Sequence, residues 1–323
     1  MVTSRDIAAA AGVSQATVSR VLAGTTTVSP ATRDRVVAAM DAVGYVPNLS
    51  ARTMKTGRTG GIGVVVADLT NPFYPQLLEA LAGALGGHRL TVWISDGPHN
   101  DAALQAIRER SVDGVIFTTV TEDSAELRGA LERAAPIVLV NRTLPELACD
   151  QVGSANRAGG ALVADHFLNH GRRPAVIGGA DTSTTHERGS GFTRRAAERG
   201  SSSLPEIYGT YTHAAGYSAM ITLLDDPQPP DAVFCTNDLL AFGALDAARV
   251  RGIRVPQDLW IVGYDDVDMA AWPAYSLTTV RQDVGELART AAGLLLARLD
   301  NPDSAPHRVE LPPTLVHRST TSR

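Results

Sequence analysis

Apolar residues recur at helical spacing in three short segments between residues 3 and 44. Each segment begins with Thr or Ser, which cap helix N-termini, and two of them end at Gly12 and Gly44, which close helices readily. Two helices joined by a tight turn at Gly12 and Val13, with a third helix behind them, form a helix-turn-helix pattern. The residues expected to face the core of this headpiece are Ile7, Ala8, Ala11, Val18, Val21, Leu22, Val36, Val37, Met40 and Val43.

From Gly61 onward the pattern changes, and short Val- and Ile-rich runs alternate with amphipathic stretches. Such alternation predicts βαβ units and parallel sheets, and two successive series of them predict two lobes. The predicted strands are Ile62–Ala67, Leu90–Ser95, Gly114–Phe117 and Ile137–Val140 in the first series, and Ala175–Gly178, Ala232–Thr236 and Trp260–Gly263 in the second. The predicted fold is therefore α/β, with an all-α headpiece ahead of a two-lobed body.

Polar and aromatic side chains follow several of these strands directly. They are Asp68 with the nearby Asn71–Tyr74, Asn141 and Arg142, Asn237 and Asp238, and Asp265 and Asp266. Ligands of open parallel sheets bind beyond the carboxyl ends of the strands. The sequence thus predicts a site for a small polar ligand between the two lobes.

Charge is distributed unevenly along the 323 residues, which suffice for two or three domains. Residues 1–58 carry a net charge of +4 within a chain of net charge −5, so the first segment is the part suited to a polyanion. Cys149 and Cys235 are too isolated for a disulfide framework. The sequence shows no apolar run long enough to span a bilayer and no signal-peptide pattern at its start, so we expect a cytoplasmic protein without a membrane partner.

The sequence contains no recognisable catalytic constellation, and we expect neither an enzyme nor a cofactor. His166 and His170 are one helical turn apart, a spacing that binds zinc when further ligands are present. No third ligand lies near them in sequence, and no Glu follows the first His as zinc proteases require. A solvated helix face is therefore the preferred interpretation, and no metal site is predicted.

The segment DIAAAAGVSQATVSRVL, residues 6–22, closely resembles the headpiece of the lac repressor/purine repressor (LacI/GalR) family of bacterial regulators. VSP and TR between residues 28 and 33, and GYVPN at residues 44–48, continue the match in register. The resemblance implies that Gln15, Ala16 and Arg20 read base edges in the major groove, Arg20 by bidentate pairing with guanine. It also implies backbone phosphate contacts by Thr3, Ser14, Thr17 and Asn48, although helix capping alone would explain Ser14 and Thr17.

Residues 48–58 form a short polar linker by composition, and the resemblance implies a hinge helix that enters the minor groove. Ala51, Met54 and Lys55 are the hinge residues expected to contact DNA there. Met54 stands where the family has a Leu wedge between central base pairs, and Met is among the apolar residues that minor-groove proteins insert.

The resemblance extends over the body, implies a periplasmic-binding-protein-like fold, and assigns effector contacts. Arg188 and Asp265 fall at the clamping positions and Asn237 at a hydrogen-bonding one, while Asn141 stands where relatives commonly have Asp. Phe73, Tyr74 and Tyr211 fall at ring-packing positions, and Asp68 joins the set as a residue that follows a strand. Each residue also has a purely structural explanation. Asn237 and Asp265 could cap a helix or a turn, and Arg188 could be a surface arginine. Phe73 and Tyr211 could be core residues.

These expectations combine into a homodimeric, sequence-specific transcriptional regulator, favoured as a repressor, that binds near-palindromic double-stranded operator DNA under effector control. The expected domains are the headpiece at 1–47, the hinge at 48–58 and the effector-binding and dimerisation body at 59–323. Within the body, 59–155 and 283–308 form the N-lobe, and 156–282 and 309–323 form the C-lobe. The Asp and Arg pair favours a sugar effector, while a purine or another metabolite stays open. The rival classes are a transport-type solute-binding protein and an enzyme.

Overall fold

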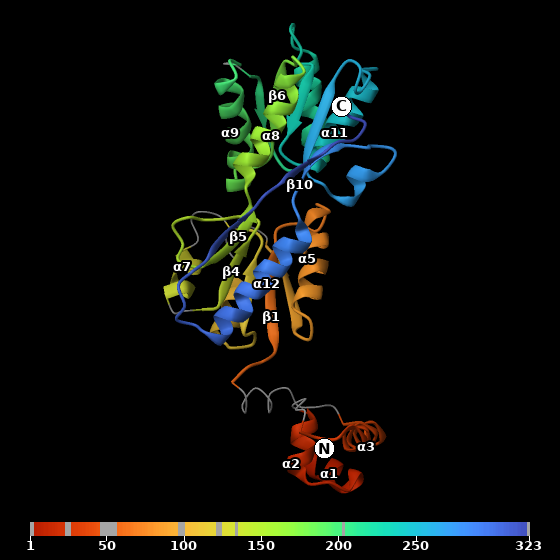
Figure 1. Cartoon of the computed structure of the whole chain (residues 1–323), viewed down its shortest axis with the longest axis vertical. Coiled ribbons are helices and arrows are strands. Elements are labelled where there is room, and N and C mark those ends of the chain that lie inside the picture. Colours follow the sequence, from red (N-terminus) through yellow and green to blue (C-terminus); the bar gives the residue numbers. More distant parts are fainter. Residues whose placement is uncertain are drawn as a thin grey trace. The chain divides into compact units, whose positions relative to one another are not determined.

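A computed structural model of the chain describes residues 3–22, 27–45, 57–95, 101–120, 125–132, 135–201 and 204–321. The chain divides into two compact units, residues 1–59 and residues 60–323 (Figure 1). Among the described residues, none of the helices combines the length and the apolar character that a membrane span requires.

Three helices form the headpiece: α1 (Ser4–Ala11), α2 (Gln15–Leu22) and α3 (Pro30–Ala42). Thr3 precedes α1, and its backbone N–H and hydroxyl both donate to the Asp6 carboxylate at 2.8 Å. Gly12 ends the helix in the left-handed conformation, with φ of 62°. The fully buried residues Ile7, Val18 and Val36 bring the three helices together in one core. Local capping and apolar spacing therefore specify this unit.

One expected core residue of the headpiece is on the surface. Val37 is 44% exposed, whereas Val36 and Ala39 are buried on the same helix. The assignment of Val37 to the core was wrong, because adjacent residues of a helix point about 100° apart and α3 buries only one narrow stripe. Its other apolar neighbours, Met40 and Val43, are partly buried against the core.

The N-lobe is built on a six-stranded parallel sheet with strand order β11-β5-β4-β3-β1-β2. Its strands are β1 (Gly61–Val66), β2 (Arg89–Ile94), β3 (Gly114–Phe117), β4 (Ile137–Val140), β5 (Asp150–Ser154) and β11 (Arg308–Leu311), and its helices are α5 (Phe73–Ala84), α6 (Asp101–Arg108), α7 (Ala125–Glu132) and α12 (Val284–Asp300). Side chains alternate along β1, so Val64 joins the cluster with α5 and α12 while Val65 joins the cluster with α6 and α7.

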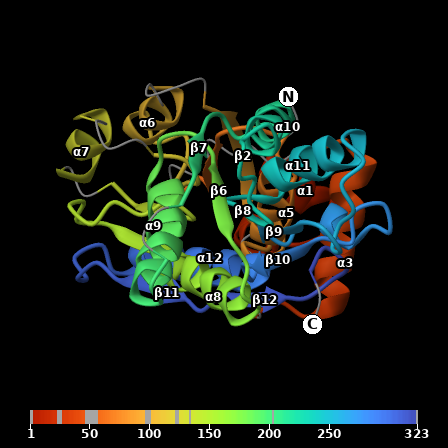
Figure 2. The same cartoon turned by 90° about the horizontal axis from the view of Figure 1, so that it is seen from above.

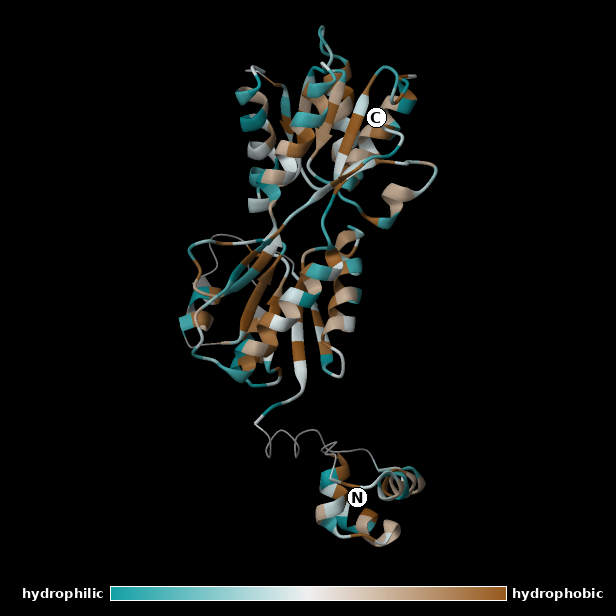
Figure 3. Cartoon of the chain, viewed as in Figure 1, coloured by the Kyte–Doolittle hydropathy of each residue, from teal (hydrophilic) through white to brown (hydrophobic). Residues whose placement is uncertain are grey.

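The C-lobe repeats this plan with strand order β12-β10-β9-β8-β6-β7, and only the β10–β12 pair is antiparallel. Its strands are β6 (Pro174–Gly178), β7 (Glu206–Tyr208), β8 (Ala232–Cys235), β9 (Trp260–Asp265), β10 (Thr278–Arg281) and β12 (Thr314–Val316). Its helices are α8 (Asn156–Asn169), α9 (Ser183–Glu198), α10 (His213–Leu224), α11 (Asp238–Val250) and a 3-10 turn at Asp268–Ala271. The central strands β1, β3, β4 and β8 are predominantly apolar and buried (Figure 3), as expected for sheets covered on both faces.

Glycines allow two pairs of C-lobe helices to pack at backbone contact. Seen from above, α10 lies beside α11 and α8 beside α9 (Figure 2). A Cβ on Gly243 of α11 would lie 2.0 Å from the His213 carbonyl oxygen of α10, and one on Gly160 of α8 would lie 2.1 Å from the Arg188 carbonyl oxygen of α9. The second contact matters for function because it sets the position of α9, which carries Arg188.

The chain crosses between the lobes three times: after β5, between β10 and α12, and between β11 and β12. β11 stays in the N-lobe sheet as far as Leu311 rather than residue 308, because it pairs with β5 up to Ser154. The expected start of the last C-lobe segment at residue 309 was therefore too early. The short strands β5, β7, β10, β11 and β12 were absent from the sequence-based prediction.

Candidate functional site

The side chains expected to read DNA lie on the outer face of α2. Gln15, Ala16 and Arg20 are exposed, while Val18 between them is fully buried. The Gln15 amide nitrogen donates to the Ser4 hydroxyl at 2.8 Å. That nitrogen carries two N–H donors, so a second donor and the amide oxygen remain for an adenine edge.

Ser14 caps α2, as the capping interpretation predicted. Its hydroxyl accepts from the Thr17 backbone N–H at 3.1 Å and lies 2.9 Å from the Thr17 hydroxyl. Both side chains are on the surface side of the helix, so capping leaves a phosphate contact possible. The other expected DNA contacts of the hinge and its approach, Asn48, Ala51, Met54 and Lys55, lie outside the described residues.

In the body, residues from both lobes line one small cavity at the carboxyl ends of the strands. The N-lobe contributes Asn71, Phe73, Tyr74, Asn141 and Arg142. The C-lobe contributes Thr184, Arg188, Tyr211, Asn237 and Asp265. All the expected effector residues except Asp68 are thus brought together, although the first and last are almost 200 residues apart. The rule for parallel sheets thus selected residues that converge on one cavity.

Arg188 is buried at the centre of this site and bonds to several C-lobe elements. Its Nη1 lies 3.1 Å from an Asp265 carboxylate oxygen and donates to the Thr236 carbonyl at 2.8 Å. Its Nε donates to the Asn156 side-chain oxygen at 3.0 Å, and its guanidinium lies 3.8 Å from the centre of the Tyr264 ring. The surface interpretation of Arg188 was therefore wrong. A buried guanidinium with this many partners is a rigid, oriented donor.

Asp265 holds its carboxylate in the site by an unusual backbone conformation. Its φ is 119°, in the region that favours glycine, and Gln282 Nε2 donates to its Oδ1 at 2.7 Å. Burial raises the pKa of Asp265, and the charge of Arg188 partly offsets this rise. Burial, followed by the Asp265 charge, also raises the pKa of the neighbouring Asp238 well above its usual range. Strain retained beside a buried ion pair is typical of binding sites.

The aromatic residues form the walls of the cavity. Phe73 and Tyr74 are buried, and their rings meet edge to face at 5.5 Å. Burial raises the pKa of Tyr74, while the nearby Arg142 charge lowers it. Tyr211 is half-buried, and its hydroxyl hydrogen-bonds with the Thr185 hydroxyl. Phe73 and Tyr211 both line the cavity and pack against the core, so the two interpretations hold together.

Two expected effector residues have other partners. Asn237 caps α11, because its side-chain oxygen accepts from the Leu240 backbone N–H at 2.9 Å. It nevertheless lines the cavity. Asp68 is outside the residues that line the cavity, and its carboxylate accepts from the backbone and the hydroxyl of Thr70, at 2.7 Å each. The structure therefore favours a turn-capping role for Asp68.

Several buried polar atoms at the site have no hydrogen-bond partner among the described residues. They are Asn141 Oδ1, Arg142 Nε and Gln282 Oε1. A buried unpaired polar atom is costly unless a ligand or water satisfies it. Thr184 and Gln282 are site or supporting residues that the sequence-based assignment missed, and Arg142 and Asn71 were selected as strand-end residues but not assigned as effector contacts. The position of Arg142 and Asn71 after strands was the signal available for them, whereas Thr184 and Gln282 carried none.

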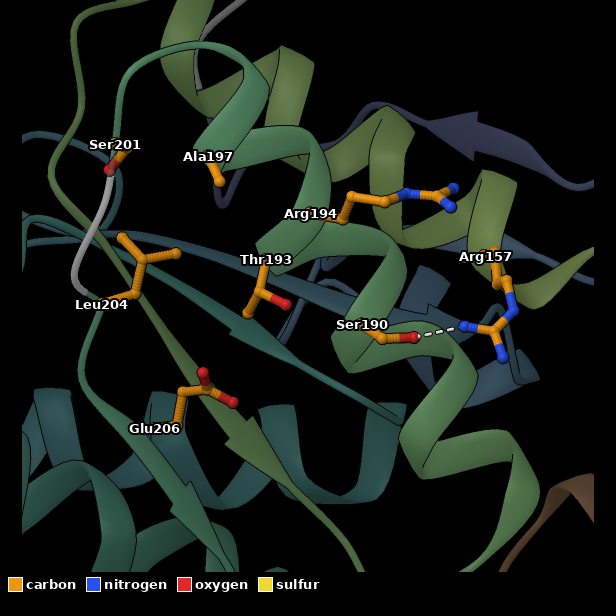
Figure 4. Close-up of a pocket in the computed structure, with 8 residues that line it drawn as sticks. All are labelled: Arg157, Ser190, Thr193, Arg194, Ala197, Ser201, Leu204 and Glu206. Carbon is orange, nitrogen blue, oxygen red and sulfur yellow. Dashed lines mark hydrogen bonds between the residues drawn. The ribbon is translucent and has the colours of Figure 1, made fainter.

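The cavity between the lobes has a volume of about 20 Å³. This is close to the space of one water molecule, so a sugar-sized ligand requires the lobes or the side chains to move apart. A larger hollow of about 420 Å³ lies on the outer side of the C-lobe, between α9 and β7, and contains Arg157, Arg194 and Glu206 (Figure 4). None of the strand-end residues lines it.

The structure supplies a third imidazole to the pair at His166 and His170. His317, which follows β12, has its ring 4.8 Å from that of His166. In the part of the chain that the structure describes, no group of three or more His, Cys, Asp or Glu is arranged to hold a metal ion. His166 is buried, so the expected solvated face was wrong for this residue.

Both units of the chain match known protein families. Residues 3–48 match the family described as "Bacterial regulatory proteins, lacI family", and residues 164–321 match the "Periplasmic binding protein-like domain". The HTH-type transcriptional regulator DegA of Bacillus subtilis (strain 168) is 35% identical over 98% of this chain and 97% of its own. The chain belongs to the lacI family of bacterial regulatory proteins.

Solved structures of other lacI-family regulators resemble the whole chain. The lac repressor dimer bound to operator and the anti-inducer ONPF matches with a TM-score of 0.85 at 27% identity, covering 99% of both chains. A complex of the transcriptional regulator CelR with cellobiose matches with a TM-score of 0.75 at 31% identity, covering 99% of this chain and 100% of that one. This lacI-family protein is therefore a transcriptional regulator with a DNA-binding headpiece and an effector-binding body.

Proposed function

We propose that the protein represses transcription by binding a near-palindromic operator as a homodimer, and that a small hydroxylated effector changes its operator affinity. It would act in the bacterial cytoplasm, where operator DNA lies, and it would catalyse no reaction. The observation that carries the proposal is the joint presence of an exposed recognition helix and a buried Arg188–Asp265 pair lining a cavity between lobes. DegA, a named transcriptional regulator, is similar to it over nearly its full length.

In this proposal the recognition helix reads each half-site through three residues. Arg20 pairs with guanine O6 and N7, Gln15 offers an amide donor and acceptor to adenine, and Ala16 contacts a thymine methyl group. Thr3, Ser14, Thr17 and Asn48 contact phosphates and set the register. Ala51, Met54 and Lys55 enter the minor groove, with Met54 as the wedge. These assignments rest on exposure where the residue is described and on the family resemblance elsewhere.

The effector would enter between the lobes and provide hydrogen-bond partners for the unpaired polar atoms there. Arg188 and Asp265 would bind ligand hydroxyls, Asn141 and Asn237 would add hydrogen bonds, and the rings of Phe73, Tyr74 and Tyr211 would pack against the ligand. A carbohydrate suits this mixture of charged donors, acceptors and ring faces. The CelR complex contains cellobiose, which is consistent with a sugar.

Operator binding tests the proposal directly. Arg20→Ala removes a bidentate guanine contact worth about 1–3 kcal/mol, so specific operator affinity should fall about tenfold or more. Electrophoretic mobility shift or fluorescence anisotropy with operator DNA measures this, with circular dichroism to verify the fold. Nonspecific DNA is the control, and its affinity should fall far less. Equal losses on both DNAs would refute a base-reading role for Arg20.

The transport alternative is a second candidate because the body matches a periplasmic-binding-protein-like domain. A solute-binding protein would bind its ligand but would not shift operator DNA. An exposed recognition helix has no use in such a protein, which favours the regulator. A purine effector is a further alternative, and a thermal-shift screen of sugars against nucleobases separates the two ligand classes.

A further inference from the structure

The cavity between the lobes carries more positive than negative charge. Two arginines, Arg142 and Arg188, line it, and Asp265 is the one carboxylate among the described lining residues. Asp265 is already paired with Arg188 at 3.1 Å and accepts a further bond from Gln282. One guanidinium charge is therefore left over at a site with little access to water.

The charge left over is that of Arg142. Its Nη1 donates to the hydroxyl of Thr119 at 3.0 Å, which is a neutral partner. None of the ion pairs among the described residues includes Arg142. Its Nε is buried and has no hydrogen-bond partner in the described part of the chain. A buried guanidinium edge without an acceptor is costly, and an oxyanion is the partner that fits it.

The preceding residue adds an acceptor rather than a second negative charge. Asn141 is buried with φ of 72°, a conformation that Asn and Asp tolerate better than most residues. Its Oδ1 lacks a donor among the described residues. An amide here leaves Arg142 uncompensated and offers one acceptor to a ligand hydroxyl. The same corner thus presents an anion-binding edge beside a hydroxyl-binding atom.

We infer that the effector is an anionic carbohydrate, a sugar acid or a sugar phosphate, whose oxyanion binds Arg142 and whose hydroxyl groups bind Asn141, Arg188 and Asp265. This inference rests on the proposed effector site and narrows its ligand class. A carboxylate and a phosphate share the oxyanion that a guanidinium binds through paired N–H groups. A neutral sugar would leave the half-buried Arg142 guanidinium without an anionic partner.

A second arginine-bearing feature must be separated from this site. The outer hollow of the C-lobe contains Arg157 and Arg194 (Figure 4). Arg157 Nη1 donates to the Ser190 hydroxyl at 2.6 Å, and Arg194 is 68% exposed with Glu198 4.0 Å away. These side chains are hydrated and face a carboxylate, Glu206, across the hollow, so they provide the control position for anion binding.

The test compares matched ligands on the full-length protein by isothermal titration calorimetry. The probes are glucose, glucuronate and glucose 6-phosphate, and galactose, galacturonate and galactose 6-phosphate. At least one charged member should bind about tenfold or more tightly than its neutral parent, since a hydrogen bond to a charged group exceeds a neutral one by this order. Preference for the acid or for the phosphate identifies which oxyanion the site takes.

Asn141→Asp is the matched variant, because it changes one atom type and keeps a residue tolerated at positive φ. A carboxylate beside Arg142 should lower affinity for the charged ligand about tenfold or more, so the preference for the charged ligand over its neutral parent should be lost. Arg142→Gln should also abolish the preference. Arg194→Gln, in the outer hollow, should leave it intact.

Tight binding of neutral sugars alone would overturn the charge inference and leave the proposed regulator standing. Failure of every probe, with operator binding intact, would overturn the carbohydrate assignment while the DNA-binding function stands. Loss of the preference in Arg194→Gln would place the anion in the outer hollow and also refute the inference. Failure of the unmodified protein to bind operator DNA would instead count against the proposed function itself.

Discussion

Three imidazole rings meet at one end of the C-lobe sheet. The His166 ring stacks on the Trp260 ring, with 5.1 Å between ring centres. The rings of His170 and His317 are centred 5.3 and 4.8 Å from the His166 ring. The guanidinium of Arg172 lies 4.4 Å from the centre of the Trp260 ring on the same cluster. Burial, together with the charges of His317 and His170, lowers the pKa of His166 to about 4. His166 therefore stays neutral in the folded protein at neutral pH.

This predicts a specific acid sensitivity. The unfolded chain protonates His166 near its ordinary pKa of 6.5, whereas the folded protein resists protonation until about 4. Below pH 6.5 the unfolded state thus binds more protons than the folded state. The free energy of unfolding therefore falls as the pH falls from 6.5 towards 4. Between pH 7 and pH 5 the loss is about 2 kcal/mol. His166→Phe keeps an aromatic ring on Trp260 but does not titrate. Denaturation curves should therefore show that its free energy of unfolding falls about 2 kcal/mol less between pH 7 and pH 5 than that of the unmodified protein. An unchanged pH dependence would refute the assignment.

At the residue scale the sequence selected many residues of the candidate site but not their partners. Arg188 was assigned to the effector site, while its bonds to Asn156 and to the Thr236 carbonyl depend on α8 and β8. Asp68 follows a strand as Asp265 does, yet Thr70 occupies its carboxylate. Position at a strand end is a local property. Which side chains converge is decided by contacts between distant segments, which a pattern along the chain does not contain.

At the element scale the closeness of helix pairs depends on glycine. Gly243 lets α11 approach α10, and Gly160 lets α8 approach α9, at positions where a side chain would meet backbone. These pairs cover the C-lobe sheet and hold the helices that border the effector site. Helical periodicity predicted the helices themselves, but a glycine inside a helix gives no indication of the partner that requires it.

Gly243→Ala should therefore destabilise the protein strongly. The added methyl group would lie 2.0 Å from the His213 carbonyl oxygen, so the helices must separate. Overpacking of this kind typically costs about 1–3 kcal/mol, visible as a lower Tm or denaturant midpoint. Gly293→Ala is the control, because nothing lies within 4 Å of its added carbon on α12. That variant should gain up to about 1 kcal/mol from helix propensity. Equal effects of the two changes would contradict the packing explanation.

At the scale of the whole molecule the chain divides into two units with separate cores. The headpiece has its own buried cluster around Ile7, Val18 and Val36, and the body has its own clusters in both lobes. Damage to the headpiece core should therefore remove DNA binding while the effector site persists. This separation is what allows one ligand to be measured without the other.

Ile7→Ala tests the separation. Truncating this fully buried side chain costs about 2–5 kcal/mol, a large part of the stability of a small domain. Operator binding should be lost or greatly weakened, while calorimetry should show the body's unfolding transition and its effector affinity unchanged. Val37→Ala, at a position 44% exposed, is the matched control and should change both activities little. A parallel loss of effector binding in Ile7→Ala would refute the independence of the two units.

The sequence by itself determined the helices of the headpiece, the alternation of strands and helices in the body, and the polar residues at strand ends. Each of these depends on neighbours within a few positions, because caps and apolar periodicity act locally. The tertiary structure alone decided that Arg188 pairs with Asp265 while Arg142 keeps an uncompensated charge, and that His317 joins His166 and His170. Those properties arise from burial and from contacts between segments distant in the sequence, which only packing of the whole body establishes.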